Sequence, residues 1–171
     1  IIFMLVACIS SAVASETVNF QHLSLNSMFP QITINGLYQD ESGVLWIGTK
    51  DGVKKYNGNY IESVNFMGIN NWIQSNLVPT ICGDKKGHLY VNTDYSIIEY
   101  DLIKEESRII FSQPNTQILP SIAFNYGINS LWIGLLDSVY NYKEGICQAK
   151  YKIDSNNLSI SSLKEASDKM L

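Results

Sequence analysis

The chain has 171 residues, of which 46% are hydrophobic and 16% are charged, and its formal net charge is −4. This length fits a single domain. The acidic balance argues against a nucleic-acid-binding face, which needs clustered Lys and Arg. Beyond the first 14 residues, no apolar run is long enough to span a bilayer. Eleven Gly and ten Tyr, with four Pro, are typical of a turn-rich all-β chain.

The chain opens with a stretch typical of a secretory leader. Residues 1–14 (IIFMLVACISSAVA) are apolar and end in the small residues Ala12-Val13-Ala14, as at a signal-peptide cleavage site. We therefore expect a signal peptide over residues 1–14. Leu5-Val6-Ala7-Cys8 also fits a lipoprotein motif in which Cys8 carries the lipid, and this alternative stays open. In residues 15–31, the alternating run TVNFQHLSL predicts an N-terminal strand segment.

The most informative stretch is DESGVLWIGTKDGVKKY, residues 40–56. Asp40 and Gly43 are typical turn residues, and Asp51-Gly52 is a strong hairpin signal. Between the two turns, residues 44–49 are apolar on both faces of the predicted strand. A strand of this kind is expected to be covered on both sides.

The same pattern recurs along the chain. GHLYVNT, residues 87–93, matches GVLWIGT, residues 43–49, at a shift of 44 residues. LWIG recurs at residues 131–134, a shift of 86 from residues 45–48, and ISSL at residues 160–163 begins a fourth repeat. Repeats of roughly 40 residues that each hold several short strands predict a β-propeller with one four-stranded blade per repeat.

We therefore expect an all-β chain made of about three propeller blades and the start of a fourth. Trp46 and Trp132 repeat in register and are expected in the core. Because the sequence stops inside the fourth repeat, we interpret it as an N-terminal fragment of a longer propeller, whose open blade faces would prevent stable folding alone. The expected blades span residues 32–76, 77–117 and 118–157, with the next one starting over 158–171. The expected strands are 32–39, 44–49, 53–56, 60–66, 78–83, 88–93, 97–101, 107–112, 121–126, 131–135, 139–142 and 147–153.

Residues 37–56, LYQDESGVLWIGTKDGVKKY, closely resemble the two-component regulator propeller repeat. The second repeat departs from it with Tyr90 for Trp and Asn92 for Gly, and the third has Tyr126 for the turn Asp and Leu135 for the Thr. The resemblance implies the periplasmic sensor region of an inner-membrane hybrid two-component histidine kinase. It also implies detection of glycan fragments, signalling to transcription, and a homodimer of the complete sensor. Membrane contact would come only through downstream segments.

No pattern in the chain points to catalysis or to a metal. It contains no Cys-x-x-Cys, no His pair at metal-ligand spacing, and no nucleophile or phosphate-loop motif. Asp40 and Asp84 fall at the same turn of successive repeats, which favours a turn role over a glycosidase pair. We expect no catalytic residue, metal or cofactor in this segment, with any kinase downstream. Cys82 and Cys147 are expected to be buried free thiols.

Topology places the expected ligand site. In a propeller, the loops that follow the second and fourth strands of each blade share one face around the central channel. In this chain these loops are polar and aromatic, which suits a sugar or another small ligand because amides and charges bind hydroxyls and a flat ring covers a pyranose face. The expected ligand-binding residues are Trp72, Asn71, Lys50, Asp51, Tyr95 and Asn115.

Two other functional classes stay open. The chain is also compatible with an exported propeller enzyme acting on polysaccharide, or with a non-catalytic interaction propeller. The sequence after Leu171 discriminates among them. A membrane span and a kinase phosphoacceptor helix would support the sensor, and a stop after the last blade would support the others.

Overall fold

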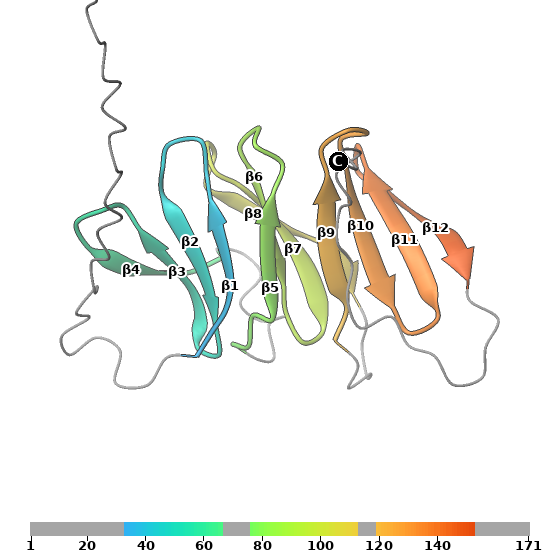
Figure 1. Ribbon diagram of the computed structural model, residues 1–171, viewed down its shortest axis with the longest axis horizontal. Coiled ribbons are helices and arrows are strands. Elements are labelled where there is room, and N and C mark those ends of the chain that lie inside the picture. Colours follow the sequence, from blue (N-terminus) through green and yellow to red (C-terminus); the bar gives the residue numbers. More distant parts are fainter. Residues whose placement is uncertain (1–32, 67–75, 113–118, 153–171) are drawn as a thin grey trace, which may run out of the picture. The chain divides into compact units, whose positions relative to one another are not determined.

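The computed structural model describes residues 33–66, 76–112 and 119–152, which belong to one compact unit over Gln31–Leu171. Within these ranges there are three four-stranded antiparallel sheets and no helix (Figure 1). A search of the same residues for a helix able to cross a membrane finds none. The expected signal peptide, N-terminal strand segment and fourth-blade start lie outside the described residues.

Each sheet is a meander of four consecutive strands. All predicted strands are present, with boundaries within two residues of those expected, which confirms the all-β fold and the four-stranded blades. The sheets comprise β1 (Ile34–Gln39), β2 (Leu45–Thr49), β3 (Gly52–Tyr56) and β4 (Ile61–Val64); β5 (Thr80–Gly83), β6 (His88–Asn92), β7 (Ser96–Asp101) and β8 (Glu106–Ser112); and β9 (Ser121–Asn125), β10 (Ser130–Leu135), β11 (Ser138–Lys143) and β12 (Ile146–Lys152).

The turn between the first two strands of a blade is held by an aspartate. The Asp40 Oδ1 atom accepts hydrogen bonds from the backbone N–H groups of Ser42 at 2.9 Å and Val44 at 3.0 Å. Asp84 repeats this in the second blade, with the N–H groups of Lys86 at 2.7 Å and His88 at 3.0 Å. The repeated geometry shows that both carboxylates cap turns, as predicted.

The third blade makes the same turn with different residues. Tyr126 stands where the other blades have Asp, and the side chain of Asn125 takes over by accepting the Ile128 N–H at 3.1 Å. Asn129 occupies the place of Gly43 and has a φ of 52°, a left-handed conformation that Asn tolerates well. The Tyr126 hydroxyl donates to the Gly83 carbonyl at 3.0 Å and so ties the third blade to the second.

A threonine closes the next hairpin. Thr49 Oγ1 donates to the Gly52 carbonyl at 2.7 Å and accepts the Asp51 N–H at 2.9 Å. Thr93 binds the carbonyl and N–H of Ser96 in the same way, at 2.9 and 3.1 Å. These bonds fix the turn that carries Lys50 and Asp51.

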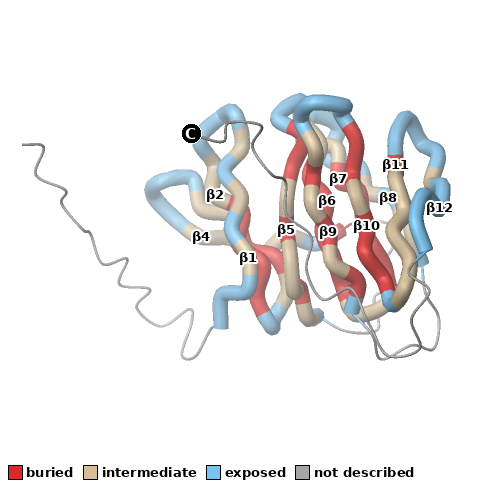
Figure 2. The backbone as a smooth tube through the Cα atoms, turned by 45° about the vertical axis from the view of Figure 1, so that its right-hand side comes forward, coloured by how far each residue is buried: buried red, intermediate tan, exposed pale blue. Residues whose placement is uncertain are grey.

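The core consists of two apolar layers, one between each pair of successive sheets. One layer includes Trp46, Leu89 and Ile98, and the other includes Leu131 and Ile133. Most positions of the central strands β6, β7 and β10 are buried (Figure 2). In β6, Leu89 and Val91 belong to the first layer and Tyr90 to the second, which confirms that a central strand is covered on both faces.

Trp132 differs from the core position expected for it. Trp46 is buried, with 5% of its surface exposed, whereas Trp132 is half-buried. The Trp132 indole stacks on Tyr151 at a centroid distance of 6.2 Å, within its own sheet. The two tryptophans differ because the second sheet covers the Trp46 face, and no further sheet among the described strands covers the Trp132 face.

Adjacent blades meet closely at one repeat position. A Cβ atom on Gly48 would lie 2.8 Å from Val78 Cγ1, so the backbone of β2 contacts the next blade directly. The Val78 N–H donates to the Thr49 carbonyl at 2.8 Å. In the second blade the equivalent residue is Asn92, whose Nδ2 donates to the Pro120 carbonyl of the third blade. Gly48 therefore lets the backbones of the first and second blades approach closely, whereas Asn92 links the second and third blades by a side-chain hydrogen bond.

Asp40→Ala is expected to lower the free energy of unfolding by about 1–3 kcal/mol, because buried or half-buried donors lose their acceptor. The Asp40 Oδ2 atom accepts the indole N–H of the buried Trp46 at 2.8 Å, in addition to the turn amides. Ser42→Ala is the matched control, since Ser42 is exposed in the same turn. Thermal unfolding of the complete protein checks this, and equal destabilisation by the two variants would refute the capping role.

Candidate functional site

The described residues of the predicted ligand site lie in turns that follow the second strand of a blade. Lys50 and Asp51 form the exposed β2–β3 turn, and Tyr95 is half-buried in the β6–β7 turn. These turns occupy the same edge of their sheets, as the topology requires. Trp72, Asn71 and Asn115 lie outside the described residues.

Two buried acceptors lie next to Tyr95 in the sequence. The Oδ1 atoms of Asn92 and Asp94 are buried and have no hydrogen-bond partner within residues 33–66, 76–112 and 119–152. Asn92 is fully buried at the end of β6, and its Nδ2 binds Pro120. Both oxygens have almost no contact with solvent, so they lie beneath the exposed polar groups of the turns.

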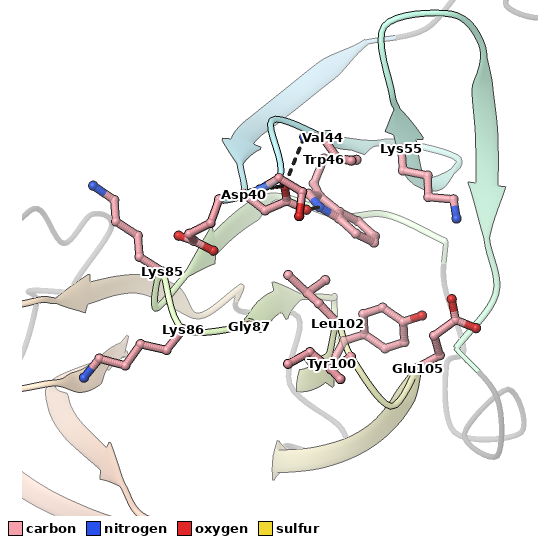
Figure 3. Close-up of a pocket in the computed structure, with 13 residues that line it drawn as sticks. Asp40, Val44, Trp46, Lys55, Lys85, Lys86, Gly87, Tyr100, Leu102 and Glu105 are labelled. Carbon is pink, nitrogen blue, oxygen red and sulfur yellow. Dashed lines mark hydrogen bonds between the residues drawn. The ribbon is translucent and has the colours of Figure 1, made fainter.

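A cavity of about 420 Å³ opens at the opposite edge, between the first and second sheets (Figure 3). The turns β1–β2, β5–β6 and β7–β8 line it. The ring of Trp46 lies on one wall, and Tyr100 with Leu102 lies on the other (Figure 3). Lys50, Asp51 and Tyr95 do not line this cavity, because they lie in turns at the other edge of the sheets.

Charged groups of both signs surround this cavity. Lys55 and Glu105 lie on one side of it, and Lys85 and Lys86 extend away on the other side (Figure 3). The Lys85 ammonium lies 4.9 Å from the centroid of the Tyr126 ring, and Lys86 Nζ donates to Asn129 Oδ1 at 2.7 Å. Burial, with a smaller effect of Glu105, raises the pKa of the Tyr100 hydroxyl, so Tyr100 is neutral at physiological pH.

A polar cluster, in which Glu99 and Tyr142 are buried and Arg108 is exposed, joins the second and third sheets. The Arg108 guanidinium donates through Nε to the Glu99 carboxylate and through Nη2 to the Tyr142 hydroxyl at 2.8 Å. The Tyr142 hydroxyl in turn donates to Glu99 Oε2 at 3.3 Å. Burial, followed by the nearby Glu99 charge, raises the pKa of Tyr142 to about 12. The ion pair and hydroxyl satisfy one another, so the cluster is a structural link between blades.

Residues 28–51 match the family model described as the two component regulator propeller. The chain carries a two-component regulator propeller repeat. Within this propeller repeat, Asp40, Trp46 and Thr49 are turn and core residues. These three residues of the repeat therefore serve the scaffold.

Solved structures share the propeller fold. The extracellular domain of BT3049 from B. thetaiotaomicron, described as a hybrid two-component system, has a TM-score of 0.59 and 21% identity over 81% of this chain and 19% of its own. Two structures of the extracellular domain of BT4673 from the same organism, described as a one-component and as a hybrid two-component system, have TM-scores of 0.58 and 0.59. Each is 16% identical over 71% of this chain and 17% of its own. The chain thus spans less than a fifth of these structures. Comparison with curated proteins gives no match.

Metal-ligand clusters are absent from the part of the chain that the structure describes. No group of three or more His, Cys, Asp and Glu side chains there is arranged to hold a metal ion. His88 Nδ1 lies 2.7 Å from Asp84 Oδ2, and this contact replaces the Trp46–Asp40 bond of the first propeller repeat. His88 therefore stabilises the turn by its contact with Asp84.

Cys82 is expected to resist alkylation by iodoacetamide at pH 8 in the folded protein. Burial raises the pKa of the Cys82 thiol to about 12, so almost no reactive thiolate is present at this pH. Both Cys82 and Cys147 are free thiols, as predicted, but each residue is half-buried rather than buried. Mass spectrometry of the native and the guanidinium-unfolded protein checks the difference. Equal rates of Cys82 labelling in the two states would show that the thiol is not protected.

Proposed function

We propose that this chain belongs to the extracytoplasmic ligand-sensing propeller of a hybrid two-component histidine kinase and response regulator. The main support for this proposal is the propeller repeat of that family. It is folded into blades that share their fold with extracellular domains of such systems. In this proposal the sensor detects glycan fragments in the periplasm. It signals through an inner-membrane segment to a cytoplasmic kinase and to transcription. The kinase and membrane anchor belong to downstream sequence, and the complete sensor is a homodimer.

The proposed ligand site is the edge that carries the β2–β3 and β6–β7 turns. Lys50 and Asp51 are exposed there on a turn that Thr49 holds in place. An ammonium and a carboxylate side by side can donate to and accept from neighbouring sugar hydroxyls, and the Tyr95 ring adds an apolar face. Trp72, Asn71 and Asn115 complete the proposed set.

Binding of oligosaccharides to the complete protein tests this site. A hit from a thermal-shift screen is measured by calorimetry on wild type and on the Lys50→Ala/Asp51→Ala and Tyr95→Ala variants. Loss of one or two hydrogen bonds to a charged group is expected to weaken binding at least about tenfold. Asn59→Ala, in the exposed β3–β4 turn at the opposite edge, is expected to leave the affinity unchanged.

Two results would contradict the proposal. Affinity that is unaffected by both turn variants would remove the proposed site. Release of shortened sugar products during the titration would instead support an exported polysaccharide-acting enzyme.

A further inference from the structure

The seam between the first and second blades repeats the geometry of the seam between the second and third. Trp46 and Tyr100 face each other edge-on across the first seam, at a centroid distance of 5.9 Å and an angle of 61°. Tyr90 and Tyr142, at the equivalent repeat positions, do so across the second seam at 6.4 Å and 73°. The two seams can therefore be compared residue by residue.

In the second seam a charged pair of the second blade lies beside the aromatic pair and contacts its tyrosine. Glu99 and Arg108 face each other across β7 and β8, and Arg108 and Tyr142 also share a hydrogen bond. The tyrosine hydroxyl contributed by the third blade thus meets both a cation and an anion of the second blade. The Glu99 carboxylate, the Arg108 guanidinium and the Tyr142 hydroxyl therefore partner one another.

The first seam has the same arrangement with the charges exchanged. Lys55 stands at the position of Glu99 and Glu62 at that of Arg108, and their charged atoms lie 3.4 Å apart. The hydroxyl of Tyr100, the equivalent of Tyr142, makes no hydrogen bond within the described part of the chain. Only 8% of the Tyr100 surface is exposed. The third tyrosine of this repeat position, Tyr56, donates to the Gly58 carbonyl at 2.7 Å. Among the three equivalent tyrosines, Tyr100 is thus the one whose hydroxyl makes no hydrogen bond to another described residue.

The unpartnered hydroxyl belongs to the wall of the 420 Å³ cavity (Figure 3). The hydroxyl is not enclosed, because the buried side-chain atoms without a partner among the described residues are Asn92 Oδ1 and Asp94 Oδ1, so water or a ligand can reach it from the cavity. The cavity also falls within the size range of small-molecule sites, roughly 300–1,000 Å³. The carboxylate of Glu105, which has no ion-pair partner among the described residues, and the ammonium of Lys55 lie on the same side of the cavity (Figure 3).

We propose that this cavity binds a neutral, hydroxyl-bearing molecule of pyranose size, held by Tyr100, Glu105 and Lys55. Vicinal hydroxyls both donate and accept, so they can donate to Glu105 and accept from Lys55 and from the Tyr100 O–H. The lining charges are balanced, with Asp40, Glu41 and Glu105 against Lys55, Lys85 and Lys86, so neither an anion nor a cation is favoured. Trp46 and Leu102 supply the apolar contact that a ring face needs.

This site is additional to the proposed ligand edge and does not require the protein to signal. It lies at the opposite end of the blades from Lys50 and Asp51. Because both blades line the cavity, its occupant contacts each of them. Binding there is expected to raise the thermal stability of the protein by mass action.

The test uses the methyl pyranosides of glucose, galactose and mannose as probes on the complete protein. Saturation-transfer NMR detects binding, and titration of the NMR signal gives the affinity. Tyr100→Phe removes only the hydroxyl and is expected to weaken binding roughly five- to tenfold, which is the loss of one hydrogen bond. Glu105→Gln is expected to weaken it by a similar factor. Tyr56→Phe is the control at the equivalent position of the first blade and is expected to leave binding unchanged.

Each outcome decides the proposal. Selective weakening by Tyr100→Phe and Glu105→Gln supports the seam site. Absence of binding by every pyranoside at millimolar concentration overturns it, as does equal weakening by Tyr100→Phe and Tyr56→Phe. Binding that is lost in Lys50→Ala/Asp51→Ala but kept in Tyr100→Phe overturns the seam site while leaving the proposed sensing edge intact.

Discussion

Gly48→Val is expected to lower the free energy of unfolding by about 3 kcal/mol, at the upper end of the usual cost of overpacking. A Cβ atom at this position would lie 2.8 Å from Val78 Cγ1 and 3.3 Å from the Val78 carbonyl oxygen. The contacted valine is stiff about χ1 and its backbone is held by a bond to Thr49, so neither group can move aside cheaply. Urea unfolding of the complete protein measures the loss.

The double variant Gly48→Val/Val78→Ala identifies the cause. Removing the Val78 methyl groups makes room for the new side chain, so the double variant is expected to be more stable than the sum of the single variants predicts. Strict additivity would mean that Gly48 is needed for some reason other than the approach of the second blade.

Leu89→Ala is expected to destabilise the protein by about 2–5 kcal/mol, the range for truncating a large side chain in a packed core. Leu89 is 0% exposed on β6 and belongs to the apolar layer that includes Trp46 of the first sheet and Ile98 of the second. Its loss leaves a void between two blades that the stiff strands on either side cannot collapse to fill.

Ile103→Ala is the matched control, because Ile103 is 84% exposed in the β7–β8 turn. Its expected effect is within about 0.5 kcal/mol. Both changes are read from the same urea transition of the complete protein. A Leu89→Ala effect no larger than that of Ile103→Ala would show that the two sheets do not share a core.

The fold was predictable because each blade repeats its own local chemistry. Asp40 and Asp84 cap the same turn with the same two amide bonds, and Thr49 and Thr93 close the same hairpin. Such local patterns depend on residues a few positions apart, which a sequence displays directly. Even the departures are local, since Asn125 replaces the missing aspartate within the same turn.

The cavity was not predictable, because it arises from a difference between blades rather than from the repeat. In the second seam Arg108 hydrogen-bonds to the tyrosine of the next blade, whereas in the first seam Lys55 pairs with Glu62 of its own blade. The sequence shows both charged pairs but not which tyrosine each one contacts. Loop topology pointed only to the edge of Lys50, Asp51 and Tyr95, so Tyr100 and Glu105 were missed.

The most direct test of the sensing function is autophosphorylation of the complete protein in inside-out and right-side-out membrane vesicles with radiolabelled ATP. The oligosaccharide that binds the propeller is added on the extracytoplasmic side. We expect phosphate incorporation that changes when this ligand is present and that no longer responds in Lys50→Ala/Asp51→Ala. Ligand binding without any phosphate incorporation, with or without ligand, would contradict a role in two-component sensing.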